Sequence, residues 1–260
     1  MTNSVGSSLG ITIKSDREVN LMRQSGVVTN NVKKLLREKI KTGMTTSDID
    51  TIAENQIRSE GAIPAFKGLY GFPATVCASI NEEIVHGIPG NRVLSDGDIL
   101  SIDVGAIVEG YYSDSAFTIG IGSIKQKSAD LIKATYDSLK VGIKKVKPGA
   151  RIGDISSAIQ QFAENSGYSV VREYVGHGIG RELHEDPQIP NYGSAGEGPL
   201  LHAGMTIAIE PMLNIGGWKT MQKEDGWTVV TSDGSLSAHF EDTILVTECG
   251  FEVLTNDEIN

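Results

Sequence analysis

The feature that most constrains the fold is an internal repeat. Residues 40–62 align with residues 146–168 at a constant offset of 106, and residues 94–106 align with residues 201–213 at an offset of 107. The matched pairs are Lys41 with Lys147, Gly43 with Gly149, Asp48–Ile49 with Asp154–Ile155, Gly61 with Gly167, Gly97 with Gly204, and Asp103 with Glu210. We therefore expect two similar helix–sheet halves, each with one acidic residue at the same place.

The composition is that of a globular protein with an acidic balance. The chain has 260 residues and a formal net charge of −10, which argues against a nucleic-acid or anionic-lipid partner. The two cysteines, Cys77 and Cys249, suit a reducing compartment. No apolar run approaches the length of about 18 residues that a membrane span needs, and the N-terminus lacks a signal-peptide pattern. We expect a cytoplasmic protein that forms one domain, with residues 1–12 as a short flexible arm.

Periodic patterns predict four helices and five strands. The second helix begins with a capping-box pattern of Thr45 and Asp48. The first expected helix begins at Ser15–Asp16, and the other three span residues 45–61, 128–146 and 152–167. The expected strands span residues 98–107, 111–121, 205–213, 227–230 and 238–246. Hairpin-type turns are predicted at residues 109–110 and 232–234, and a loop of functional length is predicted at residues 186–200.

The first predicted hairpin carries two aspartates, which are unusual residues in strands. A two-residue turn at Glu109–Gly110 places Gly105 opposite Asp114, so that Asp103 shares the face of Asp114 as its diagonal neighbour. Diagonal Cβ atoms lie about 7–8 Å apart or less, within reach of one ion or an ion pair. A single aspartate in this setting is more often a turn cap or a solvated side chain, and a three-residue turn would separate the two.

Two glutamates extend this acidic set. Glu210 follows an apolar run without a nearby Lys or Arg, so a buried carboxylate there needs a cation. Glu241, in the second half, occupies the place that Asp114 has in the first. A pseudo-twofold axis would bring the four acids together, and two divalent ions would neutralise them. The sequence therefore predicts a dinuclear metallohydrolase site.

Three histidines in glycine-rich turns complete the predicted site. They are His177, His184 and His86, whereas His202 and His239 lack this context and are interpreted as ordinary residues. A lone histidine is more often structural than a ligand, but the neighbouring acids favour the functional interpretation. A site of carboxylates with one imidazole is rich in oxygen ligands and suits Mn²⁺, Fe²⁺ or Co²⁺, whereas structural Zn²⁺ sites are made of thiolates.

The motifs SIDVG, GYYSDSA, VGHGIGRELHEDP, TIAIEPM and HFEDT together resemble the type I methionine aminopeptidases in order and spacing, over about residues 12–254. This resemblance implies an α+β pita-bread fold, with two pseudo-twofold-related halves around a curved antiparallel sheet, as one catalytic domain over residues 1–260. It implies two divalent metal ions per chain, Co, Mn or Fe. The implied ligands are Asp103, Asp114, His177, Glu210 and Glu241, with Asp114 and Glu241 bridging the two ions.

The resemblance also implies a reaction and a substrate. A metal-bridging water or hydroxide would attack the first peptide carbonyl of newly made proteins and peptides that begin with methionine and continue with a small residue. Glu210 would shuttle the proton, His184 would stabilise the oxyanion, and His86 would contact the scissile amide. The implied methionine pocket is lined by Phe66, Leu69, Phe72, Cys77, Leu183 and Trp227. A monomer with a transient ribosome contact is expected.

The pocket departs from the family pattern at three places. Phe66 and Leu69 stand where many relatives carry Cys and Tyr, and Leu183 stands where many carry an aromatic residue. The metal ligands are unaffected, whereas the pocket shape is expected to differ. For any one of these apolar residues, packing in the core is an equally good interpretation.

Three alternatives share the fold. Xaa-Pro peptidases use a similar ligand set but usually carry an additional N-terminal domain, and type II methionine aminopeptidases carry a helical insert in the second half. Only a loop is expected between His177 and Glu210. A binding module without catalysis would have lost ligands, and all five are present.

Overall fold

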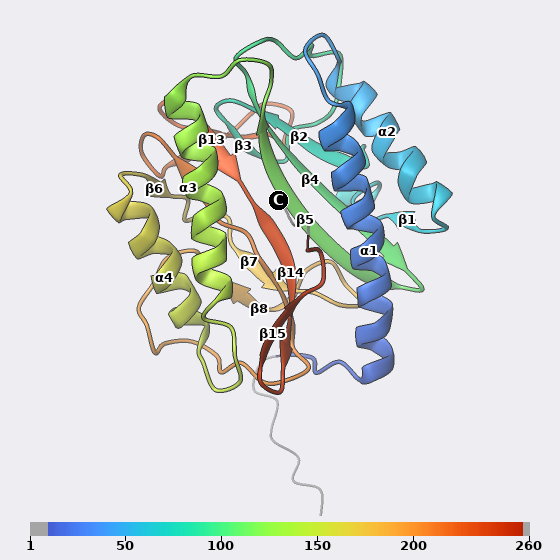
Figure 1. The fold of residues 1–260 in the computed structure, drawn as a ribbon, viewed down its shortest axis with the longest axis vertical. Coiled ribbons are helices and arrows are strands. Elements are labelled where there is room, and N and C mark those ends of the chain that lie inside the picture. Colours follow the sequence, from blue (N-terminus) through green and yellow to red (C-terminus); the bar gives the residue numbers. More distant parts are fainter. Residues whose placement is uncertain (1–9, 257–260) are drawn as a thin grey trace, which may run out of the picture.

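Four helices cover one face of a curved antiparallel sheet in the computed structural model, which describes residues 10–256 (Figure 1). The helices are α1 Asp16–Lys39, α2 Thr46–Ser59, α3 Gln126–Ile143 and α4 Ile152–Asn165, with a short 3₁₀ turn η1 at Leu69–Gly71. The four predicted helices are thus confirmed, although α3 begins two residues earlier than expected and ends before Val146. Of the expected arm, residues 1–9 lie outside the described residues, whereas the Thr12 hydroxyl donates to Glu185 at 2.7 Å.

The main sheet has the strand order β1-β4-β5-β14-β9-β7-β8, with β2 on β4 and β15 on β14. These strands are β1 Ile63–Pro64, β2 Val76–Ile80, β4 Ile99–Val108, β5 Tyr111–Gly120, β7 Gly176–Gly178, β8 Glu185–Ile189, β9 Thr206–Ile209, β14 Glu241–Thr247 and β15 Gly250–Val253. Two small sheets flank it. One joins β13 Ser237–His239, β10 Met212–Asn214 and β6 Ser169–Val170, and the other joins β11 Thr220–Gln222, β12 Val229–Thr231 and β3 Glu83–Val85.

The internal repeat is a structural repeat. Helices α2 and α4 are offset by the same 106 residues at both ends, and in each the third residue, Asp48 or Asp154, accepts a 2.8 Å hydrogen bond from the backbone of the N-cap residue. The matched glycines share the left-handed backbone: Gly43 and Gly149 at φ 89° and 83°, Gly61 and Gly167 at 77° and 84°, Gly97 and Gly204 at 95° and 86°. Strands β5 and β14 pair at the centre of the sheet, where the two halves meet.

Two predicted strands are each broken in the structure. The run 205–213 divides into β9 and β10, which belong to different sheets, because Pro211 after Glu210 has no N–H to continue the ladder. The run 238–246 divides at Phe240 into β13 and β14. Glu210 therefore lies in a break between strands rather than within one.

Two further predictions were wrong in detail. The turn at 232–234 does not form a hairpin, since β12 pairs with β3 and β11 whereas β13 pairs with β10. The predicted loop 186–200 begins inside β8, which pairs with β7. The segment from His177 to Glu210, all of it described, contains no helix, as expected for a chain without a helical insert.

The main core lies between the helices and the sheet. Val28 and Val32 of α1 are buried as expected, whereas Leu35 is half-buried and its neighbour Leu36 is fully buried instead. Among residues 10–256, no helix is long and apolar enough to span a membrane.

Candidate metal centre

The β4–β5 hairpin positions the first two acids. Its turn residues, Glu109 and Gly110, both have positive φ, at 47° and 82°, which defines a two-residue turn whose twist matches the strands. Gly105 faces Asp114, so Asp103 is the diagonal neighbour of Asp114 on the same face. The predicted register is confirmed, and both carboxylates lie on one side of the sheet.

Ala116 links the two halves of the acidic set. It is the direct cross-strand partner of Asp103 on β4 and also of Glu241 on β14. Residues directly opposite each other share a face, so Ala116 lies between Asp103 and Glu241 in the floor of the site, two residues from Asp114. A small side chain here leaves room between the carboxylates.

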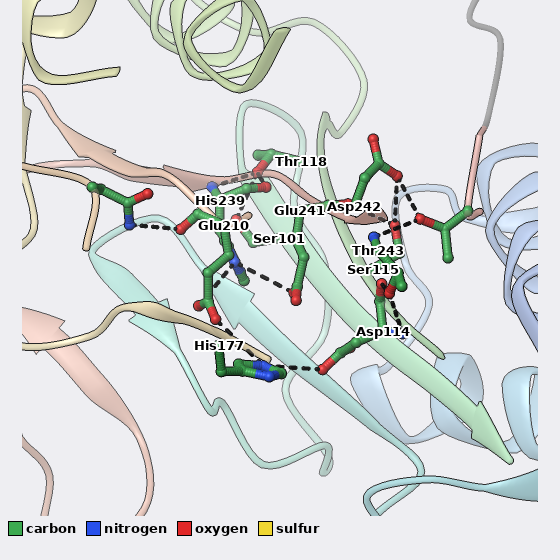
Figure 2. A network of polar contacts seen from close by, with 12 residues as sticks. Ser101, Asp114, Ser115, Thr118, His177, Glu210, His239, Glu241, Asp242 and Thr243 are labelled. Atoms are coloured by element: carbon green, nitrogen blue, oxygen red, sulfur yellow. Dashed lines mark hydrogen bonds and ion pairs between the residues drawn. The ribbon is translucent and has the colours of Figure 1, made fainter. Parts of the chain in front are cut away.

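His177 and Glu210 approach from the other half. His177 pairs with Ala208 across β7 and β9, and Glu210 follows β9 two residues later. The His177 Nε2 lies 3.7 Å from Glu210 Oε1 and 3.9 Å from Asp114 Oδ2 (Figure 2). The five predicted ligands therefore converge, and one ligand atom each of Asp114, His177 and Glu241 lies within 4.8 Å of the others.

The two glycines beside His177 are required by close packing. A Cβ on Gly176 would lie 2.3 Å from the Ala208 oxygen, and one on Gly178 would lie 2.1 Å from the Asp186 oxygen. The Nδ1–H of His177 donates to the Gly178 carbonyl at 2.9 Å, which leaves the Nε2 lone pair for a cation. Burial, together with nearby His184, lowers the His177 pKa to about 4, so the ring is neutral at pH 7.

The carboxylates have the properties of cation ligands. Burial raises the pKa of Asp103, Glu210 and Glu241 well above the ordinary range, and repulsion from neighbouring carboxylates adds to it. Burial likewise raises the Asp114 pKa to about 7. Asp103 Oδ1, Asp114 Oδ1 and Glu241 Oε1 are buried without a hydrogen-bond partner. Buried acids with open oxygens and one neutral imidazole fit divalent cations.

All of the predicted site residues line one cavity of about 160 Å³. Its lining contains Phe66, Leu69, Tyr70, Phe72, Cys77, His86, Asp103, Asp114, His177, Leu183, His184, Glu210, Trp227 and Glu241. The acids and His177 form one side, and apolar side chains form the other. Burial, with the nearby acids, raises the Cys77 pKa, so this thiol is neutral and belongs to the apolar side.

The other two histidines of the predicted site, His86 and His184, also line this cavity. His86 has a left-handed backbone at φ 60°, and its ring packs edge-on against Trp227 at 6.5 Å. Burial and the neighbouring His184 lower the His86 pKa to about 4. His184 has an exposed side chain whose ring is partly covered where it lies edge-on to His177 at 4.5 Å, and this partial burial also lowers its pKa. Both rings are therefore neutral hydrogen-bonding groups at pH 7.

Sequence reasoning missed three residues of the site. Tyr70 lines the cavity, stacks on His184 at 6.1 Å and has a strained left-handed backbone at φ 50°. Ala116 has no reactive group, and His239 was interpreted as ordinary although it lies beside two of the acids. The position of His239 two residues before Glu241 was the available signal, whereas Tyr70 and Ala116 had none.

The chain matches the model of metallopeptidase family M24 over residues 20–248. It is 51% identical over 245 residues to methionine aminopeptidase 1 of Bacillus subtilis, covering 94% of this chain and 99% of that protein. The structure of a methionine aminopeptidase from Thermotoga maritima is similar at a TM-score of 0.93 and 47% identity, covering 95% of this chain and 99% of that one.

The Xaa-Pro peptidases show a more distant likeness. The prolidase structure from Pyrococcus horikoshii has a TM-score of 0.77 at 25% identity, and the match covers 95% of this chain but only 64% of that one. The shared fold, the converging acids and the near-complete match to the methionine enzymes agree with one another. The chain belongs to metallopeptidase family M24, and within it to the methionine aminopeptidases.

Proposed function

We propose that this protein removes the N-terminal methionine from peptides and newly made proteins whose second residue is small. The observation that carries the proposal is the single cavity with an acidic side and an apolar side. Its volume of about 160 Å³ is below the range of sites for drug-sized ligands, so it suits one side chain. A site that accepts one residue beside a cation centre favours an exopeptidase.

The acids and His177 would hold two divalent ions, of which Mn²⁺, Fe²⁺ and Co²⁺ best suit the ligands. Asp114 and Glu241 come from the two central strands and would bridge the ions, with His177 and Glu210 on one side and Asp103 on the other. Such ions would lower the pKa of a bound water and polarise the peptide carbonyl.

Three side chains around the ions would transfer the proton and bind the scissile peptide bond. Glu210, which lines the cavity, would accept and return the proton. Neutral His184 would donate to the oxygen of the scissile carbonyl, and neutral His86 would contact the scissile amide. A bulky second residue would approach the acids and clash, which explains the preference for a small one.

The apolar side would receive the methionine side chain. Phe72 and Trp227 meet edge-on at 5.1 Å, and the remaining apolar lining comprises Phe66, Leu69, Cys77 and Leu183. Aromatic edges make favourable contacts with a thioether sulfur. One domain over residues 1–260, a cytoplasmic location, a monomeric state and a transient ribosome contact stay predictions.

The test is release of methionine from Met-Ala-Ser by the Mn²⁺-loaded protein, with Met-Leu-Ser and an Xaa-Pro peptide as comparison substrates. Methionine should be released from Met-Ala-Ser at least tenfold faster than from either comparison. No release, or faster cleavage of the Xaa-Pro peptide, would contradict the proposal.

Asp114→Asn tests the proposed ligand set. Removing one charge from the bridging carboxylate should lower kcat/KM by more than a hundredfold and weaken Mn²⁺ binding, measured by calorimetric titration. The exposed Asp130 on α3 provides the matched control, and Asp130→Asn should leave both unchanged. Full turnover by Asp114→Asn would remove Asp114 from the ligand set.

A further inference from the structure

His239, at the end of β13, lies beside the acids without taking part in the predicted ligand set. Its side chain is 2% exposed, and its Nε2 is buried without a hydrogen-bond partner. This atom lies 3.8 Å from Glu210 Oε2 and 3.9 Å from Glu241 Oε2 (Figure 2). An unpartnered buried nitrogen between two carboxylates is costly unless it interacts with one of them.

The backbone of His239 is held firmly to the centre of the sheet. Its N–H donates to Thr118 Oγ1 at 2.9 Å, and the Thr118 hydroxyl contacts the His239 carbonyl at 2.8 Å. Ser101 Oγ lies a further 2.8 Å from Thr118 Oγ1, which ties this contact to β4 (Figure 2). The backbone that carries the ring is therefore tied to β5 and, through Thr118, to β4.

The two carboxylates beside Nε2 determine whether this nitrogen carries the ring proton. A histidine ring presents Nε2 either as a lone pair that accepts or as an N–H that donates. When Glu210 and Glu241 are ionised, as cation ligands are, a lone pair on Nε2 would face two carboxylate oxygens and be repelled, whereas an N–H there would be attracted by both. The geometry thus favours the tautomer with its proton on Nε2.

Among the four acids of the site, Glu210 is the one that lies outside a strand. It lies in the break between β9 and β10, and its carbonyl is held by Asn191 Nδ2 at 3.0 Å. Its two carboxylate oxygens face different histidines, Oε1 towards His177 at 3.7 Å and Oε2 towards His239 at 3.8 Å. The carboxylate of Glu210 therefore lies between the two histidine rings.

We propose that His239 is a positioning residue: its Nε2–H faces Oε2 of Glu210 across 3.8 Å and would close to hydrogen-bond distance when Oε1 of Glu210 and His177 hold a metal ion. This inference rests on the proposed function, because it assigns a support to one of the proposed ligands. In this role, His239 contacts neither the metal nor the substrate.

The first test compares His239→Leu, which lacks a donor, with His239→Gln, which presents a neutral N–H at a similar reach. Loss of a group that supports a metal ligand typically weakens metal binding by about 10–100-fold. His239→Leu should weaken Mn²⁺ binding by at least about tenfold and alter the visible absorption of the Co²⁺-loaded protein. His239→Gln should recover most of the affinity, and the same changes at the exposed His202 should have no effect.

Two results would overturn the inference. One is a His239→Leu protein that binds Mn²⁺ as the unaltered protein does and has the same Co²⁺ spectrum. The other is a folded His239→Gln protein as defective as His239→Leu, since that would indicate a requirement for the ring and not for the donor.

The second test uses the unaltered protein and does not depend on the folding of variants. Long-range ¹H–¹⁵N NMR spectra of histidine-labelled protein report which ring nitrogen carries the proton, and His239→Gln assigns the signal. We expect a proton on Nε2 of His239 in the Zn²⁺-loaded protein. A proton on Nδ1 would exclude the proposed hydrogen bond.

These experiments separate the inference from the function on which it rests. If the unaltered protein neither binds Mn²⁺ nor releases methionine, the proposed function fails. If the unaltered protein does both and His239→Leu matches it, only the role of His239 fails.

Discussion

At the scale of single residues, the metal site depends on a side chain without chemistry of its own. Ala116 is 2% exposed and is opposed by Asp103 on one side and Glu241 on the other. Directly opposed Cβ atoms are about 4.5–5.5 Å apart, so the space between these carboxylates is limited by the size of residue 116. An alanine leaves that space for cations.

Ala116→Val should therefore weaken Mn²⁺ binding by about tenfold or more, because added methyl groups would occupy the space between the two acids. Added bulk in a packed region also costs about 1–3 kcal/mol of unfolding free energy. Ala106→Val is the matched control, since Ala106 is fully buried on the opposite, helix-facing side of β4. It should lower stability while Mn²⁺ affinity, measured by calorimetry, stays unchanged. Equal affinities of the two variants would contradict this role of Ala116.

Residue type decided which parts of the site could be predicted. Acids in strands and histidines between glycines are chemically conspicuous, so Asp103, Asp114 and His177 were identified and the structure brings them together. Tyr70 was missed because its place depends on a strained backbone at φ 50°. His239 was missed although it lies two residues before Glu241, because its contact with Glu210, which is distant in sequence, arises only from the fold.

At the scale of elements, one turn sets the register on which two acids depend. The β4–β5 turn requires positive φ at Glu109 and Gly110, and with this turn Gly105 faces Asp114. The turn was predictable because its signal is local. The break at Pro211 also had a local signal, since proline lacks the N–H of a strand ladder, whereas the break at Phe240 depends on a sheet that the neighbouring strand joins only in three dimensions.

Gly110→Ala tests the turn. The conformation at Gly110 costs a non-glycine residue about 1–2 kcal/mol, and a Cβ there would meet no atom within 4 Å, so the effect is purely conformational. We expect the unfolding free energy, measured with urea, to fall by about 1 kcal/mol. Gly250 is the matched control, since a Cβ there also meets nothing and its φ is not left-handed. Gly250→Ala should change stability by less than about 0.5 kcal/mol. Equal losses in both would contradict the argument.

At the scale of the whole molecule, the repeat brings four acids to one place. Each half contributes two carboxylates, and the contact of β5 with β14 joins them at the centre of the sheet. This arrangement was predictable in outline, because matched caps and glycines revealed the repeat and a repeat suggests symmetry. Its consequence is physical: the fold places like charges together in a buried region, and either protons or cations must neutralise them.

The stabilisation by metal should therefore depend on pH. Burial raises the folded-state pKa of Asp114 to about 7, above an ordinary value of about 3.9. Its protonated form thus contributes stability that is present below pH 3.9 and is lost as the pH rises through 7. His177, with a pKa of about 4, is neutral from pH 6 to 8 and does not compete there.

Cations that replace these protons should stabilise the protein more as the pH rises from 6 to 8, by at most about 1.4 kcal/mol per pH unit for each proton displaced. The measurement is the difference in Tm between Mn²⁺-loaded and metal-free protein across this range. Calorimetric titration at pH 6.5 in two buffers of different ionisation enthalpy should show proton release on Mn²⁺ binding. The Asp130→Asn control should reproduce both results. A Tm difference that stays constant from pH 6 to 8, or binding without proton release, would show that these carboxyl groups are not the groups that cations neutralise.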